Sequence, residues 1–188
     1  MASNRENFRS QIFWEGNGEL SHWYSYVNRA PHVTGHIMLA NDEENFEIHR
    51  VPKGFEAALT VNIEILLKWA NEHKGGKCLP VFYRMNIAGE QFRVHILPVS
   101  LKEIEGASRL LANRIPDLAG DKGGFLYFLG GQEHLADQRD LAFRKCRENG
   151  EAIKRLMEDV GIPTVVGQLQ GIVAESGEFA NNPLKPTA

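Results

Sequence analysis

The chain has 188 residues, 43% of them hydrophobic and 24% charged, and a formal net charge of −3, which is typical of one globular domain with a sizeable core. Lys and Arg are spread along the sequence without a basic cluster, so nucleic-acid binding is not expected. We expect a cytoplasmic protein that does not insert into membranes, because the chain begins without the apolar segment of a secretory signal and no apolar run approaches the roughly 20 residues that span a bilayer.

The first part of the chain predicts strands followed by one helix. Residues 20–28, 33–40 and 45–51 are rich in aromatic and β-branched residues and are separated by turn-forming sequences, so each is predicted to be a strand. Residues 55–73 repeat apolar side chains at helical spacing and precede two glycines, which indicates a helix that ends there. Its predicted buried stripe consists of Leu59, Ile63, Leu66, Leu67 and Ala70.

A β-hairpin is predicted next, over residues 78–99. Its arms, 79–85 and 91–99, flank the turn-like sequence NIAG. The remaining predicted elements are a helix over 101–115, a strand buried on both faces over 124–129, a long helix over 136–160 and a last strand over 164–173. This mixture of strands and helices predicts an α/β or α+β fold, which we expect to form a single domain over 1–188.

Cys78 and His95 stand at the two ends of the predicted hairpin, seventeen positions apart (95 − 78). Folding the hairpin over its turn is expected to bring them together, because antiparallel neighbours lie about 5 Å apart. A thiol beside an imidazole is the simplest nucleophile–base pair for attack on an amide carbonyl, and the adjacent Lys77 favours the thiolate. The alternative is a buried cysteine and a strand histidine without chemistry. The other cysteine, Cys146, lies on the inward face of the long predicted helix and is predicted to belong to the core.

The other histidines show neither HxH nor HExxH spacing, so we expect no metal site and no cofactor. Four of them lie in the N-terminal strand region and could converge in space: His22, His32, His36 and His49. The paired glycines of the chain form neither a GxGxxG nor a Walker pattern, so the sequence does not indicate a phosphate-binding loop.

From residue 78 to about 179, the order of short sequence features resembles CheD, the chemoreceptor glutamine deamidase family. The matching features are Cys78, then His95, Leu97 and Pro98 within FRVHILP, FLGG at 128–131, RENGEAI at 147–153 and GIPTVVGQLQG at 161–171. The chain departs from the family at Lys77, where the family usually has serine. The resemblance makes 78–179 a CheD-like core and leaves 1–77 as N-terminal strands and a helix added to it.

What this resemblance implies is a three-layer sandwich with a mixed sheet and flanking helices. It also implies a cysteine-dependent deamidase that hydrolyses protein glutamine side chains to glutamate, with Cys78 as the nucleophile and His95 as the general base. Asn86, Gln91 and Lys77 are then the candidates for orienting the imidazole or stabilising the oxyanion. The partner would be a chemoreceptor or another glutamine-bearing protein, and no cofactor would be needed. Related Cys–His deamidases occur among bacterial toxins, so an exported effector is the alternative location.

A second resemblance is to the histidine-triad proteins. The segments that carry it are 23–31 and 35–39, which are similar to the entry strands of that family, and 88–91 with 95–98, which are similar to its AGQ…HLIP stretch. The HxHxH triad is absent, because Gln91 and Arg93 occupy its other positions, and the family's nucleotidyl chemistry needs those imidazoles. This resemblance implies a nucleotide-binding protein without the triad and ranks second to the deamidase. A non-catalytic interaction protein on the same fold is the third hypothesis.

Overall fold

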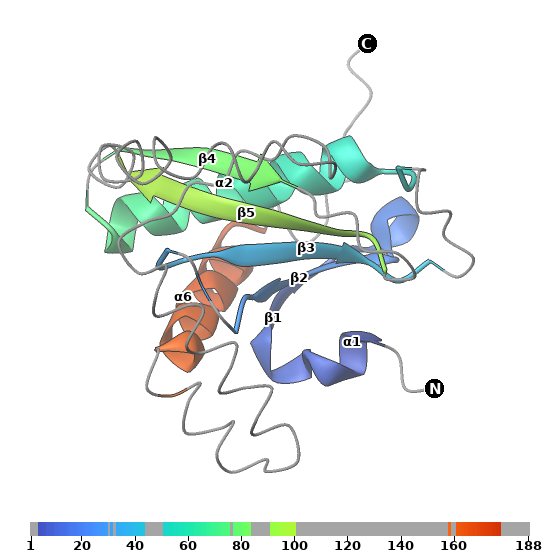
Figure 1. Ribbon diagram of the computed structural model, residues 1–188, viewed down its shortest axis with the longest axis horizontal. Helices are drawn as coiled ribbons and strands as arrows, with labels where there is room; N and C mark the ends of the chain where they lie inside the picture. Colours follow the sequence, from blue (N-terminus) through green and yellow to red (C-terminus); the bar gives the residue numbers. More distant parts are fainter. Residues whose placement is uncertain are drawn as a thin grey trace, which may run out of the picture.

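The computed structural model describes residues 4–29, 31, 33–43, 51–75, 77–83, 91–100, 158 and 161–177. The elements of these residues are α1 (Asn4–Asn7), the 3-10 turn η1 (Arg9–Gln11), β1 (Ile12–Glu15), the 3-10 turn η2 (Gly18–Leu20), β2 (Trp23–Val27), β3 (Ile37–Asn41), α2 (Phe55–His73), β4 (Cys78–Tyr83), β5 (Arg93–Ser100) and α6 (Ile162–Glu175) (Figure 1). The elements predicted at 45–51, 101–115, 124–129 and 136–160 lie almost wholly outside the described residues. None of the helices in the described ranges is long and apolar enough to cross a membrane.

The strands form one five-stranded sheet in the order β1-β2-β3-β5-β4 (Figure 1). The predicted combination of strands and helices is confirmed, and β2, β3 and the β4–β5 hairpin occupy the segments predicted for them. Each of the four strand pairs in the described residues is antiparallel, so the expectation of a mixed sheet is wrong for this part of the chain. Because β3 pairs with β5, strands from both sides of residue 77 belong to the same sheet.

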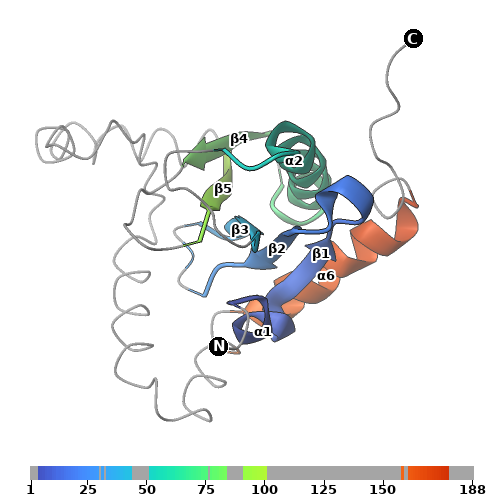
Figure 2. The same cartoon turned by 90° about the vertical axis from the view of Figure 1, so that its right-hand side faces the viewer.

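Helices α2 and α6 cover the same face of the sheet (Figure 2). α2 contacts β3, β4 and β5, whereas α6 contacts β1 and β2, and the two helices contact each other. The main core lies between these helices and what we term the helix-covered face of the sheet, which carries Trp23, Val27, Ile37, Leu39, Val94 and Ile96. Alternate strand residues point the opposite way. This second face carries Tyr24, Tyr26, Met38 and Ala40, which form a separate buried cluster, together with Arg93 and His95 of β5.

The bounds of α2 agree with the helix predicted over 55–73, but its buried stripe is rotated. The fully buried residues are Ala58, Asn62, Ile65, Leu66, Trp69 and Ala70. Leu59, Ile63 and Leu67 are only half-buried, contrary to the prediction. The buried stripe is rotated toward Trp69, because the indole Nε1 of Trp69 donates a hydrogen bond to Oε1 of Gln168 in α6, at 2.9 Å. A buried indole needs such a partner, and a leucine does not.

The strand predicted over 164–173 is wrong, because this segment is helix α6. The prediction relied on its β-branched valines and isoleucines. Their spacing is helical instead: Ile162, Val165, Val166, Leu169 and Ile172 are the buried residues and follow the i, i+3, i+4, i+7 pattern of one helix face. A proline in the first turn of the helix, where no intrahelical N–H bond is lost, is also compatible with this start.

The connection between β2 and β3 passes close to Trp69 at Gly35. Gly35 has φ of +86°, and a Cβ atom there would lie 2.2 Å from Cζ3 of the Trp69 ring. We expect Gly35→Ala to lower the free energy of unfolding by about 2–4 kcal/mol, because it combines a left-handed conformation with overpacking. Urea unfolding monitored by tryptophan fluorescence measures the loss.

Gly75→Ala is the matched control for that substitution. Gly75 also has positive φ, +67°, but no atom of the described residues lies within 4 Å of the position its Cβ would take. Only the conformational penalty of about 1–2 kcal/mol is therefore expected. Equal losses in the two variants would contradict the packing argument.

Candidate anion-binding site

The hairpin register separates Cys78 from His95. Cys78 pairs with Ser100 and His95 pairs with Tyr83, so the two residues are five positions apart along β5 (100 − 95). Five steps at about 3.4 Å each amount to about 17 Å. Because the number of steps is odd, the two side chains also point to opposite faces of the sheet. The prediction that this hairpin places the thiol beside the imidazole is wrong.

Cys78 lies on the helix-covered face and belongs to the main core. Its side chain is 9% exposed, and its strand packs against α2. This is the setting of a small apolar core residue rather than of an accessible nucleophile. The alternative of a buried cysteine therefore describes its position better. The neighbouring Lys77 is exposed.

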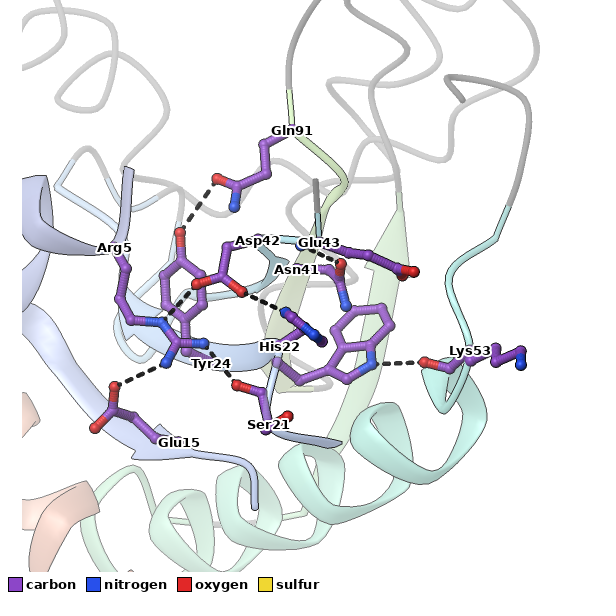
Figure 3. A network of polar contacts seen from close by, with 11 residues as sticks. Arg5, Glu15, Ser21, His22, Tyr24, Asn41, Asp42, Glu43, Lys53 and Gln91 are labelled. Atoms are coloured by element: carbon purple, nitrogen blue, oxygen red, sulfur yellow. Dashed lines mark hydrogen bonds and ion pairs between the residues drawn. The ribbon is translucent and has the colours of Figure 1, made fainter. Parts of the chain in front are cut away.

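Of the two amide side chains that were candidates for orienting the imidazole, Gln91 lies within the described residues. Gln91 accepts a hydrogen bond from the Tyr24 hydroxyl at Oε1, at 3.2 Å (Figure 3). Burial raises the pKa of Tyr24, which keeps this hydroxyl protonated and able to donate. Asn86 lies outside the described residues, as does Cys146.

His95 contacts another histidine, His36. Nε2 of His36 and Nδ1 of His95 are 2.9 Å apart, which is a hydrogen-bond distance. The sheet produces this contact: His95 is paired with Met38 on β3, and His36 lies two residues before Met38, just before that strand. His36 is fully buried, whereas His95 is half-buried.

Asn28, the residue after β2, also contacts His36. Its backbone N–H donates to the carbonyl oxygen of His36 at 2.9 Å. Its side-chain Nδ2 lies 3.2 Å from Nε2 and 3.4 Å from Nδ1 of the His36 ring, and 3.6 Å from the sulfur of Met38. These contacts fix the orientation of the buried ring.

Two arginines add positive charge on the second face. Arg93 lies two residues before His95 on β5 and therefore points to the same side of the sheet. Its guanidinium carbon is 5.5 Å from the centre of the Phe8 ring, and that of Arg29 is 4.8 Å from the same ring. The Phe8 ring in turn stacks on Tyr26, with centroids 4.2 Å apart. The two cations and the two rings form a layer beside the histidine pair.

Arg29 is held firmly in this layer. Its Nε donates to Oε1 of the buried Gln11 at 3.1 Å, and its Nη2 donates to the carbonyl oxygen of Asn7 at 2.6 Å. Burial lowers the pKa of Arg29, but an arginine stays protonated throughout the physiological range. The Arg29 side chain therefore keeps its positive charge at any pH at which the protein works.

A separate polar network connects α1 to the far ends of β2 and β3 (Figure 3). Nε of Arg5 lies 3.0 Å from Oδ2 of Asp42, and the other carboxylate oxygen, Oδ1, lies 3.3 Å from Nδ1 of His22. Arg5 also contacts Glu15 at 3.5 Å and donates to the carbonyl oxygen of Ser21 at 3.0 Å. Its guanidinium faces two carboxylates, so this network is a structural clamp.

The sequence pointed to part of this cluster. His36 was one of the four histidines that could converge, and Gln91 and Arg93 were found, with His95, at the positions of the HxHxH triad. The pairing of β3 with β5 is what brings His36 to His95, and nothing in either segment alone reveals it. Within the described ranges, no group of three His, Cys, Asp or Glu side chains could hold a metal ion. No protein-family model matches this chain, and no curated protein matches it.

Proposed function

We propose that this protein binds a small phosphorylated molecule of the nucleotide type on the second face of its sheet, without transferring the nucleotide to a histidine. The observation that carries the proposal is the His36–His95 contact of 2.9 Å next to Arg93 on the same face. Imidazole N–H groups and a guanidinium are the donors that proteins use for phosphate oxygens, and the guanidinium can donate two parallel bonds.

The placement of the segments similar to histidine-triad proteins supports the nucleotide. The segment 35–39 and the segment 95–98 are far apart in sequence, but they lie on neighbouring strands, with Ile37 paired to Ile96. Arg93 stands where that family has a triad imidazole. A guanidinium binds phosphate but is not a nucleophile, so the arrangement favours binding over covalent transfer.

The deamidase hypothesis has less support from the geometry. It needs one substrate carbonyl to meet the Cys78 thiol and the His95 imidazole together, and the register puts these groups on opposite faces. The non-catalytic hypothesis is compatible with the proposal, because a sheet that binds a phosphorylated ligand need not convert it.

Arg93→Gln tests the proposal. We expect wild-type protein to bind AMP and not adenosine in isothermal titration calorimetry, since the phosphate supplies the charge that Arg93 recognises. A hydrogen bond to a charged group contributes about 1.5–3 kcal/mol. Its loss in the variant should therefore weaken AMP binding roughly 10- to 100-fold. A thermal melt of the variant shows whether it is folded.

Arg9→Gln is the control for a simple loss of positive charge. Arg9 lies in η1 with its side chain 80% exposed, where it pairs with Glu6. Its removal should change AMP affinity less than about twofold, because exposed charges are screened by solvent. Equal binding of AMP and adenosine, or equal weakening by the two substitutions, would overturn the proposal.

A further inference from the structure

β4 lies at one end of the sheet, and within the described residues no strand pairs with its outer edge (Figure 1). The N–H of Asn41 donates to the carbonyl oxygen of Phe92, so Phe92 and every second residue of β5 after it bond to β3. The intervening residues of β5, which pair with the odd-numbered residues of β4, bond to β4. The main-chain groups of Pro80 and Phe82 therefore point away from the sheet.

This outer edge is apolar as well as unpaired in the described part of the chain. Leu79 is 51% exposed on the second face of the sheet, and Phe82 is 52% exposed on the helix-covered face. β4 has the sequence CLPVFY, without a charged residue, and Pro80 removes only one of its donors. Charged side chains are a common means by which monomeric proteins keep edge strands from pairing with another chain, and β4 does not use it.

Helix α2 runs beside β5 in the same direction and covers β4 as well (Figure 2). Phe55 at its start contacts Phe92, with ring centroids 5.4 Å apart. Trp69 near its end packs beside Gly35, where an added Cβ would also meet Pro98. The 14 positions between these contacts on α2 (69 − 55) rise about 21 Å, and the six on β5 (98 − 92) rise about 20 Å, so helix and strand keep level with each other.

α2 extends the apolar edge into the second layer of the fold. Leu59, Ile63 and Leu67 follow one another at four-residue spacing and are only half-buried. Because α2 is right-handed and runs with β5, this stripe lies on the flank above β4, whereas the opposite flank faces α6. We term Leu59, Ile63, Leu67 and Phe82 together the α2–β4 edge.

Ile63, the middle residue of the stripe, is about level with Phe82. The register partner of Phe82 is Ile96, four of the six positions along β5 (96 − 92). The same fraction of α2 corresponds to about residue 64. The α2–β4 edge is therefore nearly symmetric about this height, with one leucine of the stripe on either side of Ile63.

We infer that two copies of this chain associate through the α2–β4 edge, with their β4 strands paired antiparallel about a two-fold axis at Phe82. Each Phe82 exchanges both of its main-chain hydrogen bonds with Phe82 of the other copy, and the two sheets become continuous. Ile63 then faces Ile63, and Leu59 faces Leu67. A second copy covers the strand and the helix stripe together, whereas a single extended peptide would cover β4 and leave the stripe exposed.

Pro80 selects this register. With the axis at Val81, the carbonyl oxygen of Phe82 would face Pro80 of the other copy, which has no N–H to donate. With the axis at Pro80, the central pair would form no hydrogen bond. The axis at Phe82 avoids both defects and coincides with the middle of the helix stripe.

Sedimentation velocity tests the association. Wild-type protein at about 100 μM should sediment as a dimer, with twice the chain mass of 21.1 kDa. Phe82→Glu should raise the dimer dissociation constant on the order of 100-fold or more, because it places two carboxylates against each other at the centre of the contact. Circular dichroism of this variant shows whether it is folded.

Val51→Glu is the matched control for introducing a charge at an exposed apolar residue. Val51 is 55% exposed, and the carbonyl oxygen of the nearby Lys53 bonds the indole of Trp23 in β2, away from β4. Its substitution should change the dissociation constant less than about twofold, as expected for a surface change outside the contact.

Cross-linking tests the register. In protein with Cys146→Ser, Phe82→Cys places two thiols across the axis with Cα atoms about 5.5 Å apart, which a disulfide spans. We expect mild oxidation to give a covalent dimer. Leu79→Cys is equally exposed on the same strand, but its two copies would lie six positions apart, about 20 Å, and should not cross-link.

Three results would overturn the inference. The first is a wild-type monomer at the stated concentration. The second is a dimer that persists unchanged in folded Phe82→Glu. The third is a disulfide that forms at residue 79 and not at residue 82, since it would place the two-fold axis elsewhere on β4.

Discussion

Trp69→Ala is expected to lower the free energy of unfolding by about 3–5 kcal/mol, the range for truncating a large buried aromatic side chain. Trp69 is 2% exposed and lies where three parts of the fold meet. Its indole donates to Gln168 in α6, and its ring packs against Gly35 in the β2–β3 connection. Truncation of Trp69 removes the contact of α2 with α6 and with the β2–β3 connection, so a large cavity forms between the helices. Urea unfolding followed by circular dichroism measures the loss.

Trp69→Phe separates the hydrogen bond from the packing. Phenylalanine keeps most of the ring volume but has no N–H, so it leaves Oε1 of the half-buried Gln168 without this donor. A loss of about 1–2 kcal/mol is expected, since the amide can turn partly toward solvent. If the free energy of unfolding falls no more in the alanine variant than in the phenylalanine variant, Trp69 does not hold α2 and α6 together as described.

Local patterns were sufficient to predict the long helix and several strands. The bounds of α2 were predicted correctly because its 3.6-residue periodicity is continuous and glycines follow it. The buried face of α2 was predicted wrongly, because hydropathy favours leucines and carries no information about the hydrogen-bond partner that Trp69 needs on another helix. Segment 164–173 was misassigned for a related reason: β-branched content was weighted above the spacing of Val165, Leu169 and Ile172.

The candidate site depended on information that a single sequence does not contain. The hairpin itself was predicted, but its register was not, and a shift of one residue exchanges the two faces of a strand. The observed register places Cys78 among the core residues and His95 on the second face. His95 contacts His36, which lies 59 positions earlier in the chain (95 − 36) just before β3, through a strand pairing that only the folded sheet specifies.

Cys78 provides the sharpest test of this register. The chain has two cysteines, so Cys146→Ser leaves Cys78 as the only thiol. We expect iodoacetamide to label it on the order of 100-fold or more slowly in the native protein than in urea. Cys78 is 9% exposed and belongs to the main core, so the reagent reaches its thiol only when β4 opens, and such openings are rarely populated.

Cys78→Ala is expected to behave as a core truncation and not as the loss of a nucleophile. Removing the buried sulfur should lower the free energy of unfolding by about 1 kcal/mol, while AMP binding on the opposite face of the sheet should not change. A catalytic thiol would give the reverse pattern: rapid alkylation of the native protein, unchanged stability, and loss of ammonia release from a glutamine-bearing protein substrate. That pattern requires a solvent-accessible Cys78 next to His95. Observing it would show that β4 and β5 pair in another register and would restore the deamidase hypothesis.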